Sequence, residues 1–201
     1  MHANEHIYDY ILDESRGMEI IIQPVTANLD KGTLDDLAKD ISEEFRANNV
    51  TVASSIELDK AEFQLAFNKQ RKQWDSFKLL EWLLRKFKRK EQKDAKILGL
   101  FDIDAYSNAF DFVFGEAYYQ GRIAAVYLPR LRQEFYSLEQ NCKLFYERLV
   151  KEAIHELGHA YGIVHCKNPR CVMYFSISLR FVDTKKRSFC QSCTKKYRLE
   201  L

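Results

Sequence analysis

The spacing of hydrophobic residues along the chain predicts alternating strands and helices. Residues 18–25 form a short β-branched run that a proline stops, which is typical of a buried strand. From Thr33 to Phe45, apolar residues recur at intervals of three and four, which predicts an amphipathic helix with Thr33 as its cap. Four further strands are predicted at 50–58, 96–103, 112–114 and 122–128, and a second amphipathic helix near Asp75.

Strands that alternate with helices indicate an α/β (mixed α+β) fold built on a twisted, mostly parallel sheet. The exception is the pair of strands at 112–114 and 122–128, which are separated by a short connection containing Gln120–Gly121. A parallel partner would need a crossover of about a dozen residues or more. We therefore expect one antiparallel strand at the edge of the sheet.

The last long helix carries the most informative residues. Ser137-Leu138-Glu139-Gln140 matches a capping box, so we expect the helix to begin at Ser137 and to run through Tyr161. Cys142 falls on the same helical face as the apolar residues Phe145 and Leu149. It is therefore expected to be a small buried side chain rather than a ligand.

Composition narrows the class of protein. The chain has 201 residues, of which 46% are hydrophobic, so it can bury a core of one domain. Its 31 basic and 29 acidic residues give a net charge of only +2, whereas nucleic-acid binders normally show a plain basic excess. No apolar stretch approaches the roughly 20 residues that cross a bilayer. We expect a cytoplasmic, monomeric protein with neither a membrane nor a nucleic-acid partner.

Three histidines near the end of the long helix suggest a metal site. His155 and His159 differ by about 40° around a helix and about 6 Å along it, so both imidazoles can face one ion. Glu156 lies about 100° further round the same turn, where a carboxylate can act on a metal-bound water. The H-E-x-x-H pattern therefore supplies two nitrogen ligands and a general base.

His165 completes this site only if the helix stops. On a continuous helix it would lie about 15 Å beyond His155, out of reach of the same ion. Gly162 tolerates the left-handed conformation that ends helices, so the chain can turn there and bring His165 back. Three protein ligands leave the fourth position of zinc open, which is the catalytic arrangement.

Four of the five cysteines form a second candidate metal site. Their spacing, Cys166-x₄-Cys171 and Cys190-x₂-Cys193, can close a tetrahedral thiolate site around zinc. Two disulfides are the alternative, which a reducing compartment disfavours. Because His165 and Cys166 are adjacent, we expect this zinc to clamp the loop that delivers the third histidine.

The complete pattern H-E-x-x-H-x-x-G-x-x-H is the extended motif of the metzincin metallopeptidases. Here it is followed at once by Cys166, then by Cys171, a Cys-Val-Met triplet and the C-x-x-C pair. This combination resembles the archaemetzincins (archaelysins), a family of zinc peptidases. The specific match covers about the last fifth of the chain, and residues 102–131 also resemble the strands before the active-site helix of that family.

The resemblance implies a metzincin-like fold with a long active-site helix and a small zinc-stapled C-terminal segment. It implies two zinc ions per chain, one catalytic and one structural, and a Met-turn methionine, which would be Met173. It also implies that an edge strand binds the substrate backbone. The matching residues are Phe112, Val113, Phe114 and Gly115.

These observations predict a zinc metallopeptidase, of endopeptidase or aminopeptidase type, that acts on a peptide or protein. Glu156 would take a proton from a zinc-activated water and pass it to the leaving amine. The alternative is a zinc-bearing binding or regulatory protein with a latent or inactive cleft. We expect one domain over residues 1–201, with the sheet and helices in 1–162 and the third histidine, Met-turn and cysteines in 163–201.

Overall fold

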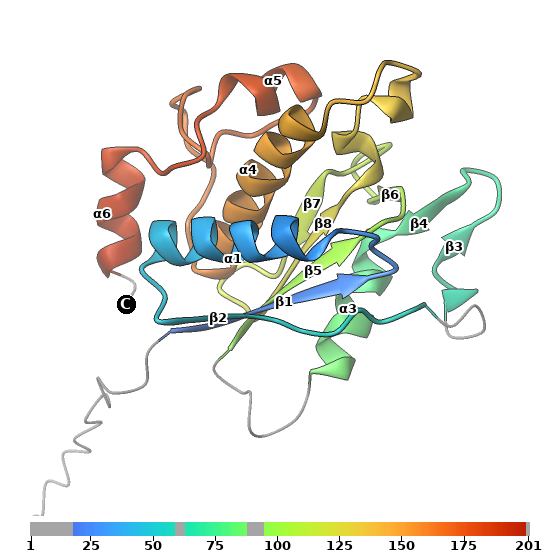
Figure 1. The fold of residues 1–201 in the computed structure, drawn as a ribbon, viewed down its shortest axis with the longest axis horizontal. Helices are drawn as coiled ribbons and strands as arrows, with labels where there is room; N and C mark the ends of the chain where they lie inside the picture. The colour runs from blue at the N-terminus through green and yellow to red at the C-terminus, as the bar shows by residue number, and fades with distance from the viewer. Residues whose placement is uncertain (1–17, 59–62, 88–94, 200–201) are drawn as a thin grey trace, which may run out of the picture.

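A five-stranded sheet lies at the centre of the computed structural model, which describes residues 18–58, 63–87 and 95–199 (Figure 1). The strand order is β2-β1-β5-β8-β7. The first four strands are parallel, and β7 pairs antiparallel with β8 at the edge, so the predicted mixed α/β fold is confirmed. The strands are β1 (Glu19–Val25), β2 (Asn49–Val52), β5 (Lys96–Phe101), β7 (Gly115–Ala117) and β8 (Ile123–Tyr127).

Helices cover both faces of this sheet, α1 and α4 on one side and α3 on the other (Figure 1). Successive strand residues point to opposite faces, and the two cores follow that alternation. Ile20 and Ile22 pack in the cluster with α1 and α4, whereas Ile21 packs in the cluster with α3. The helices are α1 (Lys31–Phe45), α3 (Ser76–Lys86) and α4 (Cys142–Ala160).

Several short elements were not predicted from the sequence. A second sheet has the order β3-β4-β6 and lies beyond the carboxyl ends of the central strands. Two single-turn helices join β8 to α4, and two helices follow the histidines. These elements are β3 (Phe67–Asn68), β4 (Gln73–Asp75), β6 (Ala105–Tyr106), η2 (Pro129–Leu131), η3 (Glu134–Tyr136), α5 (Leu179–Thr184) and α6 (Gln191–Leu199).

The predicted start of the long helix is wrong. Ser137 lies at the end of η3 in the left-handed region, with φ of 58°, and α4 begins only at Cys142. Asn141 is the cap, because its side chain accepts a hydrogen bond from the Leu144 amide at 2.9 Å. Cys142 is consequently exposed at the first turn instead of buried.

Three other boundaries also differ from the predictions. Asp30, not Thr33, caps α1, since its carboxylate accepts from both the amide and the hydroxyl of Thr33. The strand predicted at 50–58 ends at Val52, and only an isolated bridge at Ile56 continues its path. The strand predicted at 112–114 is a loop, and β7 begins at Gly115.

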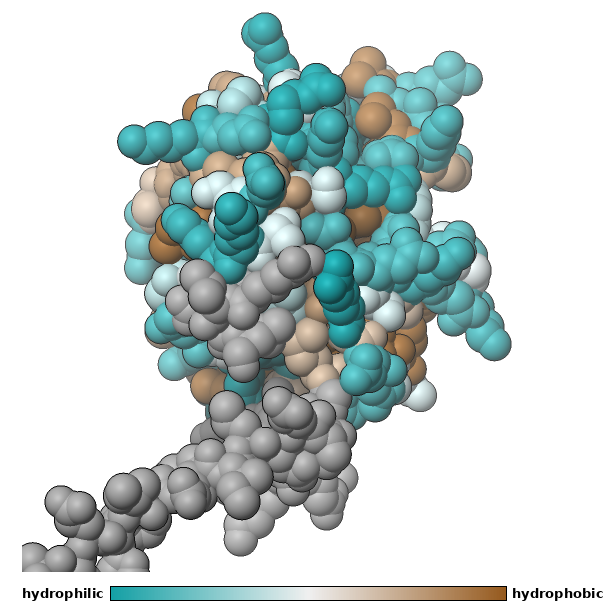
Figure 2. All heavy atoms as spheres, turned by 90° about the vertical axis from the view of Figure 1, so that its left-hand side faces the viewer, coloured by the Kyte–Doolittle hydropathy of each residue, from teal (hydrophilic) through white to brown (hydrophobic). Residues whose placement is uncertain are grey.

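The C-terminal segment shares a core with the rest of the chain. One buried cluster includes Leu37 of α1, Leu157 of α4, Met173 and Tyr197 of α6. The face on which α6 lies is mainly hydrophilic, with hydrophobic side chains only in small separate areas (Figure 2). Within the described residues, none of the helices combines the length and apolarity that crossing a membrane requires.

Candidate active site

The end of α4 brings three histidines together. The helix stops at Ala160, and Gly162 adopts φ of 84°, in the left-handed region that ends helices. The Ile163 amide then donates to the Gly158 carbonyl at 2.9 Å, which turns the chain back on itself. His165 consequently lies beside His155 and His159, and the predicted helix stop is confirmed.

The three imidazoles point their Nε2 atoms at one another. The Nε2 atom of His159 lies 3.1 Å from that of His155 and 3.2 Å from that of His165. The other ring nitrogens of His155 and His159 lie 2.8 Å from the carbonyl oxygens of Val172 and Ile163. A carbonyl can only accept, so each Nδ1 carries the proton and each facing Nε2 presents a lone pair.

Such converging lone pairs fit a metal cation. Burial lowers the pKa of His155 well below its usual value and that of His159 to about 4, and it also lowers the pKa of His165. The rings are therefore neutral at pH 7, as metal ligands must be. The hydrogen bonds to backbone carbonyls also fix the tautomer and ring orientation, as is usual for metal-binding histidines.

Glu156 lies between this histidine cluster and the edge strand. It is 5% exposed, and burial followed by the neighbouring Glu152 carboxylate raises its pKa well above the usual value. The edge strand approaches it closely at Gly115. A Cβ atom on Gly115 would lie 2.5 Å from Glu156 Cγ and 2.8 Å from the Ala125 carbonyl oxygen, so any side chain there would displace Glu156 or the strand.

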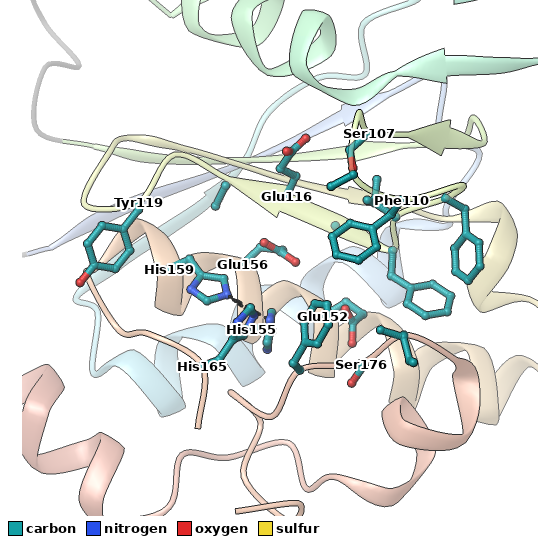
Figure 3. A pocket seen from close by; sticks show the side chains of 18 of the residues that line it. Ser107, Phe110, Glu116, Tyr119, Glu152, His155, Glu156, His159, His165 and Ser176 are labelled. Atoms are coloured by element: carbon teal, nitrogen blue, oxygen red, sulfur yellow. Dashed lines mark hydrogen bonds between the residues drawn. The ribbon is translucent and has the colours of Figure 1, made fainter. Parts of the chain in front are cut away.

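A cleft of about 510 Å³ runs past these residues, between α4 and β7 (Figure 3). The residues predicted to bind the substrate backbone, Phe112, Val113, Phe114 and Gly115, all line it. Only Gly115 belongs to the edge strand, however, and the other three lie in the loop before it. Phe114 stays linked to β8 because its carbonyl accepts from the Tyr127 amide at 2.8 Å.

The four cysteines form a second cluster on the other side of His165. Their sulfur atoms lie within 4.8 Å of one another, as a tetrahedral metal site requires. The Asn168 amide donates to Cys166 Sγ and the Cys190 amide to Cys171 Sγ. Burial opposes ionisation of Cys190, but the Cys193 amide and neighbouring thiols lower its pKa to about 7. All five cysteines are free thiols, so the disulfide alternative is not what the structure shows.

Comparison with known proteins identifies the family. The model of peptidase family M54 matches residues 21–199. The chain belongs to this family. The archaemetzincin of Methanocaldococcus jannaschii is 37% identical over 179 residues, which cover 89% of this chain and 92% of that protein. That of Thermococcus kodakarensis is 34% identical over 177 residues, covering 88% and 94%.

Solved archaemetzincins share the fold. The structure from Methanopyrus kandleri superposes with a TM-score of 0.77 at 32% identity, covering 94% of this chain and 98% of that one. The structure from Archaeoglobus fulgidus, complexed with malonate, gives a TM-score of 0.71 at 34% identity, covering 89% and 99%. The predicted resemblance to archaemetzincins is thus confirmed, and the protein is a zinc metallopeptidase of that family.

The predicted Met-turn residue of this M54 chain is fully buried. Met173 packs against α4 at Gly158, where a Cβ atom would lie 2.5 Å from the Met173 sulfur. Gly158 directly precedes His159, and the Val172 carbonyl that holds His155 directly precedes Met173. Met173 therefore supports the helix turn that carries the histidines, as a packing residue rather than a ligand.

Sequence reasoning missed other residues of the cleft. Tyr161 and Tyr174 are close to the histidines in the sequence and are therefore candidates for a place in the cleft. In the structure, Tyr161 packs against Phe45 and Tyr174 packs against Phe181. The tyrosine that lines the cleft is Tyr119, whose hydroxyl donates to the Gly162 carbonyl at 2.8 Å. Glu152, Phe110 and Phe175 also line the cleft; the position of Glu152 one helical turn before Glu156 was the available signal.

Proposed function

We propose that this chain hydrolyses peptide bonds with Glu156 as the general base, and that His155, His159 and His165 hold the catalytic zinc. The observation that carries the proposal is the set of three facing Nε2 atoms, two of them with lone pairs fixed by backbone hydrogen bonds, beside the buried carboxylate of Glu156. Neutral imidazole nitrogens fit zinc, and three of them leave its remaining position for water or substrate.

Glu156 has the environment of a base. Zinc, when bound, supplies Lewis-acid chemistry, which acidifies a water molecule and polarises a carbonyl group. Glu156 takes the proton of the attacking water, since a poorly solvated carboxylate is a stronger base than one in bulk water. The resulting carboxylic acid then donates that proton to the leaving amine.

The edge strand β7 supports the binding of an extended substrate. Among the strands of the described residues, β7 pairs only with β8, and its residues Gly115–Ala117 line the cleft. A peptide can therefore add to the sheet through backbone hydrogen bonds and lie across the histidines. We assign the substrate-backbone role to β7 and to the preceding loop from Phe112, which forms the wall of the same cleft.

The cysteine cluster supports a second, structural zinc. Four sulfurs within 4.8 Å of one another leave no position for a substrate, and backbone amides donate to two of them. Cys166 follows His165 directly, so an ion held by the cysteines fixes the loop that carries the third histidine. The expected content is two zinc ions per chain.

The test combines peptide digestion with metal analysis. The zinc-loaded chain is incubated with a mixed peptide library, and the products are read by mass spectrometry alongside Glu156→Ala. We expect cleavage by the native chain, its loss in the variant, and two zinc ions in both, counted by plasma mass spectrometry. Glu139→Ala, at an exposed acid outside the cleft, is the matched control and should cleave normally.

Two results would contradict the proposal. Full cleavage by Glu156→Ala would remove the assigned base. No cleavage by the native chain with two zinc ions bound would favour the alternative of a binding or regulatory protein with an inactive cleft.

A further inference from the structure

A buried ion pair forms part of the cleft wall. Glu152 lies one helical turn before Glu156 on α4 and is 3% exposed. Its Oε1 atom lies 2.8 Å from Nζ of Lys185, a residue that follows α5 and whose side chain is 0% exposed. Isolated buried charges are costly, so these two groups stabilise each other as a neutral pair.

Only one of the two carboxylate oxygens of Glu152 is used in this pair. Oε1 is shielded from solvent, whereas Glu152 reaches the surface of the cleft. The ion pair with Lys185 is made by Oε1, which is fully shielded. Among the described residues, Oε2 does not share in this pair and is not one of the fully buried polar atoms that lack a partner, so Oε2 is the oxygen available to the cleft. A carboxylate oxygen in the wall of the cleft loses its contact with solvent when a substrate covers it, and a hydrogen-bond donor on that substrate would offset the desolvation cost.

The space around this oxygen is mainly apolar. Figure 3 shows Glu152 across the cleft from Phe110, on the opposite side of His155 from Tyr119. The rings of Phe110 and Phe175 lie 5.7 Å apart, and Ile177 completes the wall at 58% exposure. This end of the cleft therefore combines apolar sides with few hydrogen-bond acceptors, among them the Glu152 carboxylate and the Ser176 hydroxyl.

We propose that this end of the cleft is a side-chain subsite in which Glu152 selects a substrate residue with an apolar body and a neutral hydrogen-bond donor at its tip, such as the phenol of tyrosine. The inference rests on the proposed peptidase function, since it names the substrate class of the same site. The donor is neutral because the Lys185 ammonium already balances the carboxylate. An added cation would leave one net positive charge beside the metal site.

Ser176 is the alternative hydrogen-bond acceptor for such a donor, because it lines the same part of the cleft. Its hydroxyl donates to the Tyr174 carbonyl at 3.3 Å, which leaves its own lone pairs free to accept. A Ser176→Ala variant separates the two possibilities. If Glu152 accepts the hydrogen bond from the substrate, Ser176→Ala should keep the preference of the native chain for tyrosine over phenylalanine.

The experiment measures binding and hydrolysis separately. The peptides form pairs that carry either tyrosine or phenylalanine at one position beside a cleaved bond. Calorimetric titration measures how tightly each peptide binds the zinc-loaded Glu156→Ala chain, and kcat/KM is measured for the same peptides with the native chain. At one position, we expect tyrosine to bind about tenfold more tightly than phenylalanine, the range of one hydrogen bond to a charged acceptor. Lysine should gain nothing over norleucine there.

Replacing the pair tests the assignment. Glu152→Met combined with Lys185→Met substitutes two apolar side chains of similar volume, an exchange that buried ion pairs often tolerate, whereas either single change would strand a buried charge. In the Glu156→Ala background, we expect the affinity ratio of tyrosine to phenylalanine to fall to about one. Circular dichroism and the zinc count verify that the double variant is folded.

The outcomes separate the two proposals. Native protein that cleaves nothing but still prefers the tyrosine peptide would contradict the peptidase and support the subsite. Equal affinities for tyrosine and phenylalanine, or a preference that survives in the double methionine variant, would overturn the subsite. A preference for lysine over norleucine would overturn the neutral donor, and loss of the preference in Ser176→Ala would transfer the role to Ser176.

Discussion

The histidine and cysteine clusters lie next to each other in the chain but are built differently. Two histidines stand on one turn of a buried helix, and backbone carbonyls hold their rings in place without any ion. The cysteines come from two loops and the start of α6, and weak hydrogen bonds that involve their sulfur atoms connect them. The fold thus preorganises the first cluster, whereas we expect a bound metal to contribute more to holding the second cluster together.

The largest expected effect is on activity, at the histidines. His159→Ala should lower kcat/KM by about 1,000-fold or more, because the metal loses a ligand. The melting temperature should change little, since the helix still packs through Leu157 and Ala160. Calorimetry and peptide hydrolysis check both quantities. A fall in melting temperature as large as that of a cysteine variant would contradict the view that the histidine cluster is preorganised by the fold.

The cysteines should show the opposite pattern. Cys171 is 1% exposed, and Cys171→Ser should remove about one zinc ion per chain and lower the melting temperature by about 10 °C or more. Activity should fall less than in His159→Ala, because the substitution affects the catalytic site only through the position of His165. Cys142→Ser, at an exposed thiol outside the cluster, is the matched control. Unchanged zinc content in the Cys171 variant would count against a four-cysteine site.

The close approach of the edge strand can be tested next. Gly115→Ala should lower kcat by about 10- to 100-fold with both zinc ions retained, because the new Cβ atom displaces Glu156. Gly99→Ala is the control, since its Cβ atom is as crowded, by Phe101 and Leu83, but on the other face of the sheet. It should cost stability and leave kcat nearly unchanged. Equal kcat losses in both variants would show a general effect of packing.

The smallest expected effect concerns Arg187, which attaches the C-terminal segment that carries the cysteines to the helices α1 and α4 without a metal. Arg187 binds Glu147 of α4 and Asp40 of α1, and the Arg187 hydrogen bond lowers the pKa of Glu147. A carboxylate with a lowered folded pKa stabilises the fold above its unfolded pKa, near 4.5, and loses this contribution as the pH falls further. Arg187→Met should therefore lower the melting temperature by about 1 to 3 °C at pH 7 and by less at pH 4.

Thermal denaturation at both pH values measures this attachment. Lys186→Met, at an exposed neighbour, serves as the control. A destabilisation by Arg187→Met that is equally large at pH 4 and pH 7 would show that the side chain acts through packing instead of charge.

The sequence predicts the features that depend on local geometry. Helical spacing places His155 and His159 on one face, Gly162 permits the helix stop, and a short connection forces the antiparallel edge strand. The errors occur where two local signals compete: Ser137 and Asn141 both make good caps, and only packing decides between them. Lys185 and Glu152 are 33 positions apart, and Gly115 and Glu156 are 41 apart, so their contacts depend on the tertiary fold.

The open edge of β7 has a consequence for the behaviour of the protein in concentrated solution. An unpaired strand edge is a template on which a second copy of a protein can add, the first step of edge-to-edge aggregation. Here the strand is only three residues long and its middle residue is the acidic Glu116. Short, charged edges resist such self-association. The same three residues therefore leave room for one extended peptide without offering a continuous surface for assembly.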